Sequence, residues 1–218
     1  MGHKIRPNSY RLGVNVDWKS RWFLDKNYPE LLEGDEAIRK IVFNKIGLAG
    51  IDSIEIERNS SHCKILIRAA KPGLVIGRGG KGIEELNKEI KSALDKLALK
   101  KKKVFNMPIN VSVEEIRRGD ISASVTAQQI GWDLEKRTAF RRTMKKYLES
   151  IMQNREVQGA KIRLAGRLDG NEIARTEWLA KGKLPLTTLR AKIDYGQATA
   201  FCSYGAVGIK VWIYKGEV

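Results

Sequence analysis

Apolar residues follow a helical period near the start of the chain and then change to alternation. Over 29–46 they recur at spacings of three and four, with Pro29 suited to a first turn and Gly47 just past the end, which predicts an amphipathic helix. The segments 54–57 and 65–68 then alternate apolar with mostly polar residues around a polar turn, a pattern typical of a β-hairpin.

The next stretch continues this unit through a glycine-rich bend. Lys71-Pro72-Gly73 interrupts the strand pattern, a short apolar turn leads into glycines at 77–80, and a long helix is predicted over 81–98. Alternation over 109–114 predicts a third strand. The order helix, strand, strand, helical turn, glycine loop, helix, strand defines a first domain over 28–116.

The two ends of the chain have different patterns. Residues 1–27 mix cations with Pro7, Asn8, Ser9 and Gly13, which disfavour a helix, and we expect a basic arm docked on the protein, the alternative being a frayed terminus. After a linker at 117–120, Asp120 is positioned to cap one helix that runs to about 153.

A second domain, 117–218, is predicted from that long helix and a small sheet. Strands are expected at 161–164, 187–195 and 207–214, and a short helix at 172–179. The predicted fold class is therefore α+β, with the basic helix of the second domain packed on its sheet.

Net charge points to a polyanionic partner. The 218 residues contain 41 Lys and Arg against 25 Asp and Glu, a formal charge of +16. Nucleic acid is the leading candidate because a basic surface gains affinity by releasing counterions from phosphates. No apolar stretch suggests a membrane span or a secretory signal, so we expect a cytoplasmic protein whose Cys63 and Cys202 stay reduced.

An enzymatic role has little support in the sequence. His3 and His62 are the only histidines, neither belongs to a cluster with metal-ligand spacing, and no nucleophile motif is present. We therefore expect no catalytic residues, no metal, no cofactor and no small-molecule substrate.

The glycine loop, Gly77-Arg78-Gly79-Gly80-Lys81, admits three interpretations. It formally satisfies G-x-G-x-x-G, but only three apolar residues precede it and no acidic residue ends a following strand, which argues against a dinucleotide site. A plain connecting turn is the second interpretation. We favour a KH-type clamp, where missing Cβ atoms let a nucleic-acid backbone approach Arg78 and Lys81.

The densest positive segment lies within the predicted long helix. Arg141, Arg142 and Lys145 fall in one sector of that helix, whereas Phe140 and Met144 belong to a neighbouring apolar face. The helix can therefore pack and present cations at once, although a solvated charged face is the common alternative.

Several longer motifs resemble the S-three family of bacterial small-subunit ribosomal proteins. They are the opening MGHKIRPNSYRLG at 1–13, PGLVIGRGG at 72–80, GRLDGNEIARTEW at 166–178, PLTTLRAKIDY at 185–195 and YGAVGIKVWI at 204–213. These motifs occur in the family's order, and the resemblance covers nearly the whole chain.

This resemblance implies an architectural protein of the small-subunit head. The first domain would be a type II KH domain, the partners would be small-subunit rRNA, mRNA and neighbouring proteins of the S-ten and S-fourteen families, and the ribosome would be cytoplasmic or organellar. Arg141, Arg142 and Lys145 match family positions at the mRNA entrance, which support unwinding of mRNA structure. Contacts with rRNA are expected from Lys4, Arg6, Arg11, Arg167, Arg175, Lys181, Lys183 and Arg190. A free KH-type regulator of mRNA is the second hypothesis.

Overall fold

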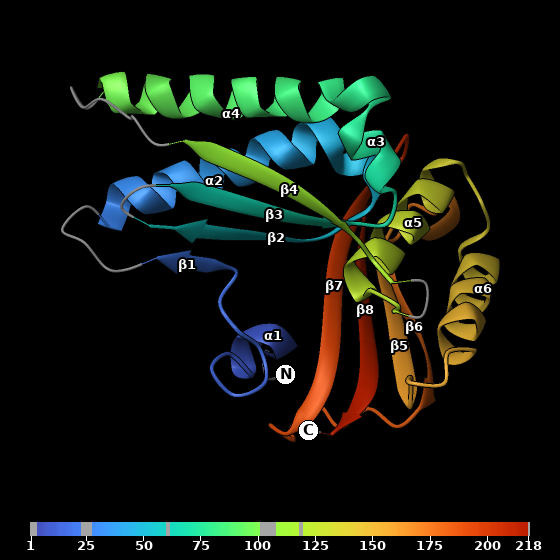
Figure 1. The fold of residues 1–218 in the computed structure, drawn as a ribbon. Coiled ribbons are helices and arrows are strands. Elements are labelled where there is room, and N and C mark those ends of the chain that lie inside the picture. The colour runs from blue at the N-terminus through green and yellow to red at the C-terminus, as the bar shows by residue number, and fades with distance from the viewer. Residues whose placement is uncertain (1–3, 23–27, 60–61, 101–107, 118–119, 218) are drawn as a thin grey trace. The chain divides into compact units, whose positions relative to one another are not determined.

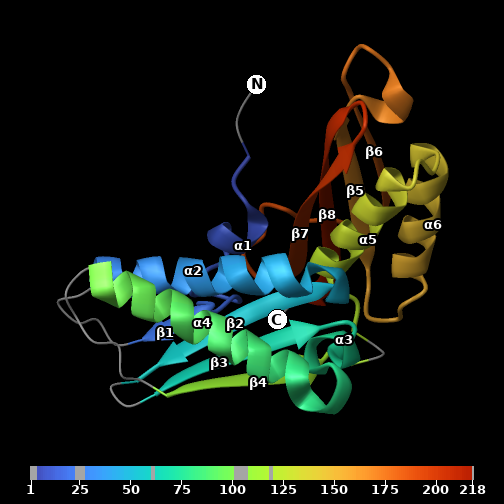
Figure 2. The same cartoon turned by 90° about the horizontal axis from the view of Figure 1, so that it is seen from above.

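The computed structural model describes residues 4–22, 28–59, 62–100, 108–117 and 120–217, which form two units. One unit comprises 18–116, and the other combines the N-terminal residues up to 17 with 117–218. Figures 1 and 2 show the elements of each unit. The expected arm over 1–27 is therefore divided, because Ser20–Trp22 (β1) pairs in parallel with Ile51–Arg58 (β2) in the first unit.

The first unit is a four-stranded sheet with two long helices on one face (Figures 1 and 2). Its strands have the order β1-β2-β3-β4, where Cys63–Ala69 (β3) is antiparallel to β2 and parallel to Ile109–Glu115 (β4). The helices are Tyr28–Ile46 (α2) and Lys81–Lys100 (α4), and the short elements are Gly47–Ala49 (η1), Pro72–Ile76 (α3) and Arg78–Gly80 (η2).

The core of this unit explains why the pattern of apolar residues predicted its helices and strands correctly. Ile54, Ile56, Ile65 and Ile67 alternate along β2 and β3 and are fully or almost fully buried. The period-3.6 residues of α2 and α4, among them Ile38, Val42, Leu86 and Ile90, complete the same cluster. The predicted helices, hairpin, glycine bend and third strand are all confirmed.

The second unit is an antiparallel sheet covered on one face by two helices (Figures 1 and 2). Its strand order is β6-β5-β8-β7, with Gly159–Gly166 (β5), Arg175–Gly182 (β6), Ala191–Cys202 (β7) and Gly205–Glu217 (β8). The helices are Ala123–Glu135 (α5) and Phe140–Met152 (α6), and the short elements are Pro7–Tyr10 (α1) and Leu168–Gly170 (η3).

The single helix expected over 120–153 is wrong, because the chain breaks between α5 and α6. Arg137 takes a left-handed conformation with φ of 62°, and the Thr138 hydroxyl donates to the Asp133 carbonyl at 2.6 Å. Asp120 is not the cap of α5. Ser122 has that position, where its Oγ accepts from the Val125 amide, and the Asp194 carboxylate accepts from the Ala123 amide.

Three further expectations for the second unit and the N-terminal segment need correction. The segment 172–179 was expected to be helical, but Arg175–Gly182 forms the edge strand β6, whose backbone hydrogen bonds come from β5. The strand expected over 187–195 begins only at Ala191 and extends to Cys202. The N-terminal segment contains the short helix α1, which Pro7 permits because it occupies the first turn.

Candidate nucleic-acid interface

The glycine loop connects α3 to α4 through backbone conformations that favour glycine. Gly77, Gly79 and Gly80 have φ values of 69°, 62° and 80°. A Cβ on Gly82, in the first turn of α4, would lie 2.6 Å from the carbonyl oxygen of Val75, so the two helices meet too closely for any side chain there. The glycines therefore set a tight helix-loop-helix bend.

The outer side of this bend is open. A Cβ on Gly79 or Gly80 would meet nothing within 4 Å, and Arg78 and Lys81 are exposed beside them. An extended backbone can therefore approach the loop closely while two cations face it, as the KH interpretation requires. The predicted loop residues therefore lie together on one accessible bend, and contact with RNA there stays a prediction.

A second group of cations lies on α6, which we call the α6 ridge: Arg141, Arg142, Lys145 and Lys146. All four are exposed. The opposite side of α6 is anchored in the core, where Phe140, Met144, Leu148 and Ile151 are buried. The predicted separation of a packing face from a cationic face is confirmed, and it survives the break that shortened the helix.

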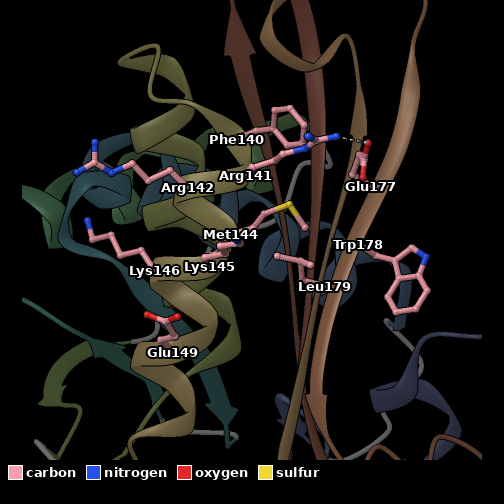
Figure 3. Close-up of a pocket in the computed structure, with 10 residues that line it drawn as sticks. All are labelled: Phe140, Arg141, Arg142, Met144, Lys145, Lys146, Glu149, Glu177, Trp178 and Leu179. Carbon is pink, nitrogen blue, oxygen red and sulfur yellow. Dashed lines mark ion pairs between the residues drawn. The ribbon is translucent and has the colours of Figure 1, made fainter.

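The α6 ridge borders a pocket of about 570 Å³ between α6 and β6 (Figure 3). Glu177 of β6 lies at its edge, with Oε1 at 3.7 Å from both Arg141 Nη2 and Arg175 Nε. Both guanidinium groups also lie over the Phe140 ring, at 5.6 and 5.4 Å from its centroid. Glu177 is thus a shared carboxylate whose role among these cations the charge pattern did not reveal.

The other three cations of the α6 ridge differ in whether a carboxylate lies beside them. Arg142 and Lys146 point away from β6 in Figure 3, and the Lys146 ammonium is 3.5 Å from an Asp133 carboxylate oxygen. Across the described ranges, neither Arg142 nor Lys145 forms an ion pair. These two side chains have their full charge available for a ligand.

The helix dipole makes the position of the two arginines unfavourable for stability. Arg141 and Arg142 follow Phe140 in the first turn of α6, where positive charge is disfavoured by about 0.3–1 kcal/mol per residue. The N-cap residue Ala139 offers no side-chain cap, and the Asp169 carboxylate accepts a bond from the Phe140 amide at a distance of 3.4 Å. The arginines are therefore not explained by helix stability.

The eight residues expected on rRNA fall into distinct environments. Arg11 contradicts the expectation: it is 0% exposed, and its guanidinium donates to the carbonyl oxygens of Pro7, Pro185, Leu186, Thr188 and Ala191. Arg167 is half-buried and donates to the carbonyls of Asn171 and Tyr204. Exposed side chains are found at Lys4, Arg6, Arg175, Lys181, Lys183 and Arg190.

Other kinds of site find no support in the residues that the structure describes. Among them, no group of histidine, cysteine or acidic side chains could hold a metal ion. No helix in the same ranges is long and apolar enough to cross a membrane. Cys63 and Cys202 are unpaired, and burial raises the pKa of the Cys63 thiol.

Together these features define an RNA-binding protein with one KH unit and a second α+β unit that presents a cationic helix. Comparison with known families agrees: residues 37–121 match a KH domain and residues 130–213 match the C-terminal domain of ribosomal protein S3. The chain belongs to the ribosomal protein S3 family. The predicted family and fold class are therefore confirmed.

Curated relatives cover the full length of this chain. It is 46% identical over 218 residues to small ribosomal subunit protein uS3 of Desulfitobacterium hafniense, with 100% of this chain and 94% of the relative aligned. The same protein of Thermosynechococcus vestitus is 45% identical, with 100% and 88% aligned, and that of Maridesulfovibrio salexigens is 44% identical, with 100% and 97% aligned.

Proposed function

We propose that this chain is a structural protein of the small ribosomal subunit that binds rRNA, and that its α6 ridge contacts mRNA at the entrance of the mRNA channel. Family membership and the KH unit support the first part. The second part rests on one observation: two arginines stand in the first turn of α6, against the helix dipole, on a helix whose other face is firmly packed.

The ridge is suited to phosphates of an extended strand rather than to a catalytic step. Arg142 and Lys145 have no carboxylate partner in the described residues, and Arg141 shares one distant carboxylate with Arg175. Cations held on a rigid helix bind successive phosphates and keep a single strand extended as a duplex opens ahead of it. Translocation supplies the work of unwinding, so this chain needs no nucleotide site of its own.

The test is translation through mRNA structure with the triple variant Arg141→Gln, Arg142→Gln and Lys145→Gln. We expect slower passage through a stable hairpin and an unchanged rate on unstructured mRNA. A matched control replaces Lys88, Lys91 and Lys96, which are exposed on α4, by glutamine. Equal rates for the two variants on the hairpin message would sink the entrance assignment.

Incorporation is measured separately by sedimentation with small subunits in a sucrose gradient at low and high salt. The full chain should remain with the subunit in both conditions, and so should both triple variants. Recovery of the wild-type chain only as free protein would favour a free regulator of mRNA instead. We propose proteins of the S-ten and S-fourteen families as the neighbours of this chain. If the chain sediments with the subunit, cross-linking within the assembled subunit tests these contacts.

For the KH loop we propose contact with RNA through Arg78 and Lys81. Replacing both by glutamine removes the charge and keeps the glycine geometry intact. We expect weaker retention on the small subunit at high salt, since fewer phosphates would be neutralised. Retention equal to wild type at every salt concentration would leave the loop as a connecting turn.

A further inference from the structure

The face of the second sheet that points away from α5 and α6 has an unusual composition. Strand alternation directs Ala160, Ile162 and Leu164 of β5 into the core under the helices, and therefore directs Lys161 and Arg163 to the opposite face. We call this opposite side the outer sheet face.

The strand register identifies which side chains share the outer sheet face. Lys161 pairs with Ala180 and Trp212, and Trp212 pairs with Tyr195. In the next row on this face, Arg163 pairs with Trp178 and Lys210, and Lys210 pairs with Gln197. The rows beyond are formed by Thr176, Ala165, Gly208 and Thr199, and by Ala206 and Phe201. None of these positions has a carboxylate.

Aromatic rings and cations are interleaved at the centre of this face. The Lys161 ammonium lies 4.5 Å from the centroid of Trp178 and 5.9 Å from that of Trp212, so it sits against two indoles. Tyr195 continues the row at 5.5 Å from Trp212. Trp178 is 58% exposed and projects away from α6 in Figure 3, which leaves much of its ring surface uncovered.

The N-terminal residues Lys4 and Arg6 add positive charge to the electrostatic environment of the outer sheet face. Burial lowers the pKa of Lys161, and the nearby positive charges of Lys4 and Arg163 lower it further. Burial raises the pKa of Tyr195, and Arg6 opposes that change. Lys4 and Arg6, both expected on rRNA, thus contribute positive potential at the aromatic row.

From this arrangement we propose that the outer sheet face is an RNA-binding surface, separate from the α6 ridge and the glycine loop. Unpaired bases stack against Trp178 on this surface. The phosphates are held by Lys4, Arg6, Lys161, Arg163 and Lys210. An exposed strand face with aromatic and basic side chains is one of the established ways in which proteins hold single-stranded RNA. The absence of carboxylates on the outer rows matches a polyanion, and the exposed part of the Trp178 indole matches the flat face of a base. A protein partner would be expected to be acidic, and that possibility is an outcome of the test.

The test compares two fluorescein-labelled 12-nucleotide probes that have the same phosphates, an oligouridylate and its fully abasic form, in binding to the purified full chain. Because a stacked base contributes roughly 1–3 kcal/mol, the intact probe should bind the wild type at least about fivefold more tightly than the abasic probe. Trp178→Ala should remove that preference, and Trp178→Phe should restore much of it. Trp18→Ala is the matched control, since Trp18 is 63% exposed in the other unit.

The cationic half of the proposal has its own readout. Lys161→Gln should reduce the slope of log affinity against log salt by about 0.7 for either probe, because one phosphate contact to a single strand is lost. Lys40→Gln, which changes an exposed lysine of α2, should leave the slope unchanged. The α6 triple variant should weaken both probes equally and preserve the base preference, so failure at the ridge is distinguishable from failure here.

Photo-cross-linking locates the bound probe on the wild-type chain, so its result does not depend on whether a variant folds correctly. A 4-thiouridine version of the intact probe should attach to peptides of β6 or β8 in the wild-type chain. Equal affinity for intact and abasic probes, a base preference that persists in Trp178→Ala, or cross-links confined to the glycine loop would each overturn the proposal. So would loss of a neighbouring protein from Trp178→Ala subunits with RNA binding unchanged, because the face would then serve a protein.

Discussion

Replacing Arg11 by methionine should destabilise the second unit rather than weaken RNA binding. Arg11 is completely buried, and its guanidinium joins α1 to the segment 185–188 and to Ala191, the first residue of β7. The carbonyl oxygens of Pro185, Leu186 and Thr188 lie outside the strands of the sheet. One planar guanidinium group reaches all three of them and that of Ala191 at once.

The magnitude follows from the lengths of the bonds. Donation to Ala191 and Thr188 occurs at 2.7 Å and to Leu186 at 3.0 Å, whereas the bonds to Pro7 and Pro185 are 3.3 and 3.4 Å long and contribute less. A hydrogen bond from a charged donor contributes about 1.5–3 kcal/mol after desolvation is counted, and three bonds from one guanidinium do not add fully. Methionine keeps the apolar stem but leaves these carbonyl oxygens without that donor, so we expect a net loss of about 2–4 kcal/mol.

Hydrogen exchange measured peptide by peptide is the appropriate assay, because two units need not unfold together. Peptides from 184–202 should lose protection in Arg11→Met, and peptides from β2 and β3 should not. Arg11→Lys should lose most of the same protection, since an ammonium lacks the planar fork. Arg6→Met, at an exposed position of the same segment, is the control and should change stability by less than about 0.5 kcal/mol. Unchanged protection in Arg11→Met together with weaker rRNA binding would refute this reasoning and restore Arg11 as an RNA ligand.

Three further predictions concern single side chains. Glu177→Gln should leave stability within about 1 kcal/mol, because its ion pairs are long and partly exposed, and should raise RNA affinity by freeing Arg141; filter binding at several salt concentrations measures this. Burial, aided by the bond to Asp133, raises the pKa of Tyr147 from 10.0 to about 12, so stability that is fully present below pH 10 should decline between pH 10 and 12. Tyr147→Phe should reduce that decline in a pH series of urea unfolding curves. Gly82→Ala should lower the unfolding free energy of the KH unit by about 1–3 kcal/mol through its clash with the α3 backbone, as chemical denaturation would show.

The first unit could be predicted from sequence because its local signals agree with its tertiary structure. Period-3.6 positions over 29–46 and 81–98 and alternating isoleucines over 54–67 all face one core. Glycines in the bend have positive φ values, which is the reason that composition marked the turn correctly. The cationic face of α6 was also predictable, since it depends only on helical spacing.

The second unit was less predictable where long-range contacts outweigh local pattern. No glycine or proline marks the turn at 136–139, so apolar periodicity appeared continuous across the break between α5 and α6. No residue of β6 is buried, and its strand form comes from pairing with β5, which lies earlier in the chain. Arg11 looked like any other cation of a basic arm. Only the fold brings it to five carbonyl groups, four of which lie more than 170 residues away.

The two proposed RNA surfaces of the second unit depend on one strand register. Along β6, Glu177 faces the α6 side, and the next residue, Trp178, faces the outer side, so a slip by one residue would exchange their faces. The register is fixed where Gly159 pairs with Gly182, because a Cβ on either glycine would collide with backbone atoms of the facing segment. A slipped pairing would place Lys181 or Lys183 opposite Gly159, where the backbones leave no room for a side chain. The two glycines therefore keep Glu177, which pairs with Arg141 of the α6 ridge, and Trp178, which we propose as a base-stacking residue, on opposite faces of the sheet.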